Sequence, residues 1–175
     1  MIADTSPGPK HAKQAKQATL TLPSDTEILI MREFDAPRAL VFEAMSKPEH
    51  VRRWWGPRGT KMLTCEIDFR VGGKWRFVLG GVEGGREDAF SGEYVEIAPP
   101  ERVVFVERYE PIPGSDHVVT STLTERDGKT LLRAHIKYPN RESRDGHLMS
   151  GMEPGLQETY QRLDELLGEL ARAAS

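Results

Sequence analysis

The sequence has little cysteine and no long apolar run. Cys65 is the only cysteine among 175 residues, which excludes an internal disulfide and a zinc site built from cysteine ligands. No apolar segment approaches the roughly 20 residues that a membrane-spanning helix requires. The first twenty residues also lack the apolar stretch of a secretory signal. We therefore expect a cytoplasmic protein without membrane insertion.

An excess of charge of one sign is also missing. The formal net charge is -3, from 24 Lys and Arg against 27 Asp and Glu, and the basic residues are scattered. We expect no nucleic-acid partner, because such proteins concentrate their basic residues in a patch. The five histidines lack metal-ligand spacing, and the glycines of residues 80–85 are not followed by the helix that a phosphate loop needs. We therefore expect neither a metal nor a cofactor.

The length fits one domain, and the composition divides the chain into two parts. Residues 1–18 contain no aromatic residue and, after the initiator Met, only Ile2 as a large aliphatic residue. Such a segment cannot bury enough apolar surface to offset the entropy lost on ordering. The remainder is long enough to bury a core without covalent support. We expect a disordered polar tail over residues 1–18 and a single domain over residues 19–172.

The expected domain begins with strands and two short helices. Residues 19–22 can form a short strand, and residues 26–34 alternate in a pattern that predicts a longer one. Asp35-Ala36-Pro37 is typical of a helix start, with Asp35 able to cap it. Pro48 begins the second helix, which Gly56-Pro57 ends. Two tryptophans stand immediately before that stop.

From Thr60 onward, a period of two continues for about eighty residues. Turn signals at Val71-Gly72-Gly73 and Asp127-Gly128 separate strands and predict an antiparallel meander. Leu63 and Cys65 are expected on the same, apolar face of the first of these strands. Gly92 inside a strand predicts a bulge or a close approach of another group. The expected strands are residues 62–69, 75–79, 89–97, 102–109, 117–126 and 129–138.

The helical period returns near the C-terminus. Residues 143–149 predict a short helix, and residues 153–171 predict a long one after a break at Ser150-Gly151. The long helix carries an apolar stripe that needs a partner surface, and the sheet is the only one large enough. The stripe consists of Leu156, Tyr160, Leu163, Leu167 and Leu170. We expect an α+β fold, with a curved antiparallel sheet of about six or seven strands around this helix.

Four stretches also resemble a known family. FDAPRALVFEAMSKPEHVRRWWGPRG, EIDFRVGGKWRF, SGEYVEIAPPERVVF and GMEPGLQETYQRLDELL occur in the order found in the SRPBCC (START-like) superfamily. Within it, the sequence resembles the bacterial branch of the heat-shock protein 90 ATPase activator homologue family, over residues 19–170. The resemblance implies the helix-grip fold of START domains and the birch-pollen allergen, with a deep cavity between sheet and helix. It implies no single activity, because the superfamily includes lipid carriers and cyclases.

The leading hypothesis is that this cavity binds a small apolar or amphipathic molecule, because apolar clefts lined by aromatic residues are the usual small-molecule sites. For each candidate, simple core packing is the competing interpretation. Adjacent helical residues point about 100° apart, so we expect one of the paired tryptophans to anchor the helices and Trp55 to lie at the cavity mouth. The candidate ligand-binding residues are Trp55, Trp75, Phe77, Phe90, Tyr94, Phe105, His135, Tyr138, Met149, Met152 and Tyr160.

Two other classes of function stay open. A cyclase or hydrolase could use His135, or the Glu66 and Asp68 pair, as acid and base. The competing interpretation of that pair is a solvent-facing strand edge. An interaction module could instead dock a chaperone through Trp54-Trp55. The eukaryotic activators use an additional N-terminal domain for that contact, and this sequence has a short polar tail there, which disfavours chaperone contact. We interpret the remaining histidines as surface or loop residues.

Overall fold

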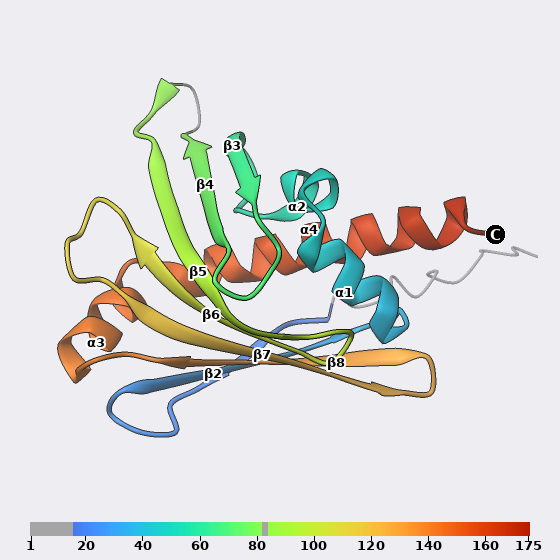
Figure 1. The fold of residues 1–175 in the computed structure, drawn as a ribbon, viewed down its shortest axis with the longest axis horizontal. Coiled ribbons are helices and arrows are strands. Elements are labelled where there is room, and N and C mark those ends of the chain that lie inside the picture. The colour runs from blue at the N-terminus through green and yellow to red at the C-terminus, as the bar shows by residue number, and fades with distance from the viewer. Residues whose placement is uncertain (1–15, 82–83) are drawn as a thin grey trace, which may run out of the picture.

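The computed structural model describes residues 16–81 and 84–175, in which a curved antiparallel sheet holds one long helix (Figure 1). The strands occur in the order β1-β2-β8-β7-β6-β5-β4-β3. Their bounds are β1 (Thr19–Thr21), β2 (Glu27–Phe34), β3 (Lys61–Ile67), β4 (Lys74–Gly80), β5 (Asp88–Ala98), β6 (Arg102–Tyr109), β7 (His117–Arg126) and β8 (Lys129–Lys137). The helices are α1 (Arg38–Ser46), α2 (Pro48–Trp54), α3 (Arg141–Met149) and α4 (Met152–Ala173).

This architecture confirms the expected α+β helix-grip fold. The sheet has eight strands rather than six or seven, because the three-residue β1 pairs with β2 at the sheet's edge. The helix α4 runs across the concave face of the sheet (Figure 1). The short helices α1 and α2 lie at one end of this arrangement, and α3 lies at the other.

The apolar stripe of α4 supplies the centre of the core. Leu163 is fully buried, and Tyr160, Leu166 and Leu167 are almost fully buried. They belong to one cluster with sheet residues such as Phe34, which packs edge-on against Tyr160 with ring centroids 5.8 Å apart. Because the stripe faces the concave side of the sheet, the helix and sheet enclose the space in which a ligand site can form.

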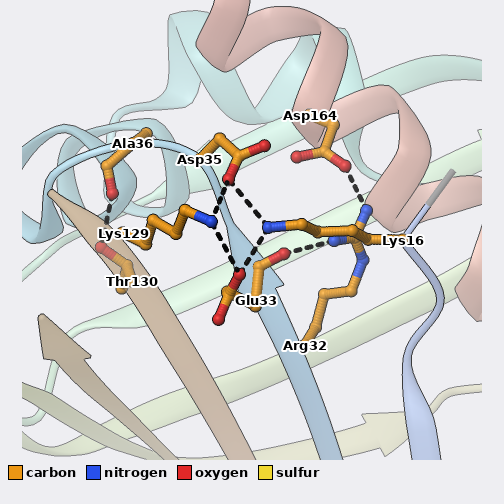
Figure 2. Close-up of polar contacts among 8 residues, drawn as sticks. All are labelled: Lys16, Arg32, Glu33, Asp35, Ala36, Lys129, Thr130 and Asp164. Carbon is orange, nitrogen blue, oxygen red and sulfur yellow. Dashed lines mark hydrogen bonds and ion pairs between the residues drawn. The ribbon is translucent and has the colours of Figure 1, made fainter. Parts of the chain in front are cut away.

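A buried ion pair fastens α4 to β2. Arg32 is only 2% exposed, and its guanidinium donates to the carboxylate of Asp164 on α4 and to the backbone carbonyl of Glu33 (Figure 2). The guanidinium also lies over the ring of Phe34, 4.9 Å from its centroid. The sequence offered no sign of this contact, because its partners are 132 residues apart.

The expected capping role of Asp35 is wrong. Its carboxylate accepts from Lys16 Nζ at 2.8 Å and lies 3.7 Å from Lys129 Nζ, as Figure 2 shows. No side-chain cap closes the start of α1, where Glu125 instead accepts from the backbone N–H of Arg38 at 2.8 Å. Two lysines therefore hold this carboxylate away from the helix terminus.

The expected placement of Leu63 on the core face of β3 is also wrong. Leu63 is 44% exposed, whereas Cys65 is buried. The register between β3 and β4 shifts between Met62 and Thr64, which marks a β-bulge. A bulge inserts an extra residue and reverses the alternation of side chains beyond it, so Leu63 leaves the core and packs over Gly80.

The expected tail lies mostly outside the described residues. Of its last three residues, Ala18 is buried and exchanges two hydrogen bonds with the side-chain amide of Gln157 on α4, at 2.9 and 2.8 Å. No helix within the described ranges is long and apolar enough to cross a membrane.

Candidate functional site: a cavity between the sheet and the long helix

A cavity of about 330 Å³ lies between the concave face of the sheet and α4. Its wall includes residues from all four helices and from β2 and β4 to β8. Most of the lining side chains are aromatic or aliphatic.

Aromatic rings form one wall of the cavity. Trp55 packs edge-on against Phe77 and Phe90, with centroid distances of 4.9 and 5.0 Å. Those two phenylalanines face each other across β4 and β5. Trp75 lies 4.8 Å from Phe77 and 5.8 Å from Phe105. Edge-on and tilted contacts of this kind are favourable between aromatic rings, and the wall that they form is apolar.

Both adjacent tryptophans border the cavity, and one of them anchors the short helices, as expected. Trp54 is 4% exposed, and its Nε1 donates to the carbonyl oxygen of Ala44 at 2.8 Å. It therefore anchors α2 to α1. Trp55 follows the end of α2 and lines the cavity. Whether it closes the mouth of the cavity stays a prediction.

The expected close approach at Gly92 is confirmed. A Cβ atom there would lie 1.8 Å from the carbonyl oxygen of Val106 and 2.7 Å from Nε1 of Trp75. Real Cβ atoms do not approach other atoms so closely, so only glycine lets the Trp75 indole lie against β5. Trp75 Nε1 is buried and, among the described residues, has no hydrogen-bond partner. The indole ring thus adds apolar surface to the wall, and its N–H is a buried donor that the described residues leave unsatisfied.

A carboxylate stands among the apolar side chains of the cavity wall. Glu107 on β6 pairs with Gly92 on β5 and with His117 on β7. Its Oε1 lies 3.0 Å from His117 Nε2, and His117 Nδ1 lies 3.0 Å from the carbonyl oxygen of Ser115. A carboxylate and a carbonyl can only accept. His117 therefore carries a proton on each ring nitrogen and forms an ion pair with Glu107.

The surroundings of His117 agree with this charge state. Burial by itself lowers the pKa of His117, but the hydrogen bond to Glu107, the charge of that carboxylate and the bond to Ser115 outweigh it. The pKa of His117 is therefore raised above its ordinary value. A buried imidazolium is stable only with such a partner.

A second pair of polar residues lies beside the first. The hydroxyl of Tyr138 lies 2.5 Å from His147 Nδ1, and the His117 ring is 5.0 Å from the Tyr138 ring and 5.5 Å from the His147 ring. Burial raises the pKa of Tyr138, so its hydroxyl stays protonated. Burial and the charge of His117 lower the pKa of His147, so its ring stays neutral. We call Glu107, His117, Tyr138 and His147 the polar cluster.

Eight of the eleven candidate ligand-binding residues line the cavity, and their contact with a ligand stays a prediction. These residues are Trp55, Trp75, Phe77, Phe90, Tyr94, Phe105, Met152 and Tyr160. Tyr160 and Tyr94 also keep their protons, because burial raises the pKa of each phenol.

The other three candidates lie elsewhere. His135 falls between the inward Ala134 and Ile136 on β8, so it faces the outer side of the sheet, where it contacts the Glu27 carboxylate. Met149 ends α3 and is 87% exposed. Tyr138 is buried, but it lies behind His147 and is not part of the cavity wall.

The carboxylates proposed for acid–base chemistry also lie outside the cavity. Glu66 is exposed on β3, and the Asp68 carboxylate accepts from Arg70 at 2.9 Å in the turn that follows. Both residues therefore lie at a solvent-facing strand edge, as the alternative to acid–base chemistry predicted. Within the described ranges, no three His, Cys, Asp or Glu side chains are grouped to hold a metal ion.

The sequence reasoning missed three members of the polar cluster. Glu107 stands at the same parity of β6 as Phe105, and His117 at the same parity of β7 as Val119. A charge or histidine on the apolar face of a strand is the signal that could have found them. His147 gave no such signal, because its position depends on how α3 folds against the sheet.

Comparisons with known proteins found a matching family and solved structures of the same fold. The family model described as Activator of Hsp90 ATPase homolog 1-like protein matches residues 35–168. A crystal structure from Rhodobacter sphaeroides is similar with 29% identity and a TM-score of 0.81, over 87% of this chain and 99% of that one. A protein of Nitrosomonas europaea has 22% identity and a TM-score of 0.77, over 86% and 99% of the two chains. No curated protein matches the chain.

Proposed function

Because this chain belongs to the family of Activator of Hsp90 ATPase homolog 1-like proteins, we propose that it binds a small apolar or amphipathic molecule between its sheet and α4. The observation that carries the proposal is the cavity of about 330 Å³ with its largely aromatic wall. Ligand pockets typically have volumes of roughly 300–1,000 Å³ and apolar walls with a few polar groups. The cavity and the polar cluster fit that description.

The energetic cost of the empty space supports the same proposal. Protein interiors are normally packed as densely as organic crystals. Side chains that border unfilled space lose part of the dispersion contacts that a dense interior provides. A bound apolar molecule restores the lost contacts. Large aromatic side chains surround the cavity without filling it.

Filling the cavity with a side chain tests this proposal. Leu156 lines the cavity from α4, so Leu156→Trp should occupy the space and abolish binding. Leu22 is 49% exposed and outside the cavity wall, so Leu22→Trp is the matched control. Each protein is titrated with a library of apolar and amphipathic molecules by amide NMR and native mass spectrometry. No shift from any compound, or equal binding by the Leu156→Trp variant, contradicts the proposal.

Chaperone association is a second candidate, and the family description is the observation that favours it. The Trp54-Trp55 segment that could dock a chaperone offers little surface, because Trp54 is buried and Trp55 lines the cavity. Stimulation of the ATPase of a bacterial heat-shock protein 90 by the purified chain tests it. An unchanged ATPase rate and no co-purification contradict it. An enzyme acting through His135 or the Glu66 and Asp68 pair has no geometric basis, since all three lie outside the cavity.

A further inference from the structure

Some polar side chains of the cavity wall are occupied by protein partners. The hydroxyls of Ser46 and Thr159 donate to carbonyl oxygens of their own helices, at 2.8 and 2.7 Å. Arg102 donates to Glu96 at 3.0 Å. Such groups contribute little to ligand recognition, because a ligand would have to compete with a bond already made.

Glu107 and His147 differ from these residues. Both line the cavity, and both neighbour the His117 ring. His117 occupies only one carboxylate oxygen of Glu107. Within residues 16–81 and 84–175, no hydrogen bond reaches the second oxygen of Glu107 or Nε2 of His147. One acceptor and one ring nitrogen are therefore available to a guest molecule.

The contact with Tyr138 decides what His147 offers. Tyr138 is 4% exposed, and its hydroxyl has His147 Nδ1 as its partner. If the hydroxyl accepted from Nδ1–H, its own buried proton would have no acceptor within the described residues, which is costly. The hydroxyl therefore donates to Nδ1, and the ring proton of His147 is on Nε2. Tyr138 is thus a positioning residue that makes His147 a hydrogen-bond donor.

We propose that the cavity selects apolar molecules that carry a hydroxyl group, namely alcohols or phenols. The hydroxyl oxygen accepts from His147 Nε2–H, and the hydroxyl hydrogen is donated to the unpaired oxygen of Glu107. A hydroxyl is the simplest group that satisfies a donor and an acceptor together. This inference rests on the proposed function and specifies the ligand class of the same site.

The charges of the polar cluster exclude other head groups. Glu107 and His117 already neutralise each other. A carboxylate guest would meet the Glu107 carboxylate, and an ammonium guest would meet the His117 imidazolium. Either would bring an additional charge without a partner into a largely apolar cavity, at a large desolvation cost. An uncharged polar group avoids this cost.

Four compounds that share one ring system test the inference. They are naphthalene, 1-naphthol, 1-naphthoic acid and 1-naphthylmethylamine, and their dissociation constants are measured by NMR titration of the full chain. Because a hydrogen bond to a charged partner contributes more than a neutral one, we expect 1-naphthol to bind at least about tenfold more tightly than naphthalene. The acid and the amine should bind more weakly than 1-naphthol.

Variants assign the preference to the polar cluster. His147→Phe should reduce the ratio of the naphthalene and 1-naphthol dissociation constants to about one, because the donor is gone. Tyr138→Phe removes one oxygen atom, is better tolerated by the fold, and should lower the same ratio in part. His135→Phe is the matched control, since that histidine is on the outer face of the sheet, and it should leave the ratio unchanged.

The outcomes separate the two proposals. Equal binding of naphthalene and 1-naphthol by the unmodified chain, or tightest binding of the acid or the amine, overturns the hydroxyl inference and leaves the proposed function standing. An unchanged ratio in both His147→Phe and Tyr138→Phe also overturns it. Binding of none of the four compounds contradicts the proposed function together with the inference.

Discussion

Removing one partner of the buried ion pair between β2 and α4 should destabilise the protein strongly. Arg32 has its side chain 1% exposed, whereas the carboxylate side chain of Asp164 is 36% exposed. In Asp164→Ala, the guanidinium stays in the core with the Glu33 carbonyl and the Phe34 ring as its remaining partners. Because Arg32 itself is covered, water can reach the guanidinium only through the partly open Asp164 site.

The magnitude follows from this asymmetry. Breaking a fully buried ion pair by removing one partner typically costs 3–5 kcal/mol, since a charge is left uncompensated. Two contacts of Arg32 survive, and the Asp164 site is partly open to water, so we expect about 3 kcal/mol. With an urea m-value of about 3 kcal/mol/M, the midpoint of unfolding would fall by about 1 M. Replacing both partners, in Arg32→Met with Asp164→Leu, should recover most of the loss.

Urea denaturation followed by circular dichroism measures these changes. The control is Glu169→Ala, which removes the partner of Arg53 in a second ion pair of α4, whose side chains are 49% and 52% exposed. Exposed pairs contribute less than about 1 kcal/mol. Equal destabilisation by Asp164→Ala and Glu169→Ala would refute the reasoning, because it would mean that burial of Arg32 makes no difference. A double variant less stable than Asp164→Ala would refute it as well.

Two further predictions concern the concave face of the sheet. Gly92→Ala should destabilise the protein by about 3 kcal/mol or more, because its Cβ would lie 1.8 Å from a backbone oxygen. Gly146→Ala, on α3 with open space around it, should instead stabilise by about 0.5–1 kcal/mol in the same assay; equal effects would contradict this. The raised pKa of His117 means that its stabilising contribution is complete below the unfolded value of about 6.5 and is lost as pH rises through the folded pKa. An NMR titration should place the His117 midpoint above about 6.5, and Glu107→Gln should lower it; a midpoint unmoved by that substitution contradicts the ion pair.

The sequence predicted the order and approximate bounds of the helices and strands, because most of these elements signal themselves locally. The Asp127-Gly128 turn and the alternation around it predicted the hairpin of β7 and β8, and the stripe from Leu156 to Leu170 predicted α4. Where the prediction was wrong, a distant partner had displaced a local preference. Asp35 is a good helix cap by type, yet Lys16 and Lys129 hold its carboxylate instead.

The cavity wall was predictable for a related reason. Large aromatic residues at inward positions of a curved sheet must face either the long helix or the space beside it, so Phe77, Phe90 and Phe105 could be named from parity alone. Met149 was placed wrongly because a helix break gives no direction to the side chain before it. Leu63 was placed wrongly because a bulge leaves no signature in an apolar run.

Local sequence patterns were not sufficient to predict the polar cluster. His117 begins a strand, where its parity with Val119 is a weak signal, and His147 lies on a short helix and gives none. Their significance arises from pairing across the sheet, which places His117 against Glu107, and from α3, which brings His147 against Tyr138. Glu107 carried the clearest signal, since a carboxylate on an apolar strand face requires a buried partner. The residue that neutralises this carboxylate is His117, which stands opposite it on the next strand of the meander. The hairpin pairing of β6 and β7 therefore links the signal of Glu107 to the polar side of the cavity.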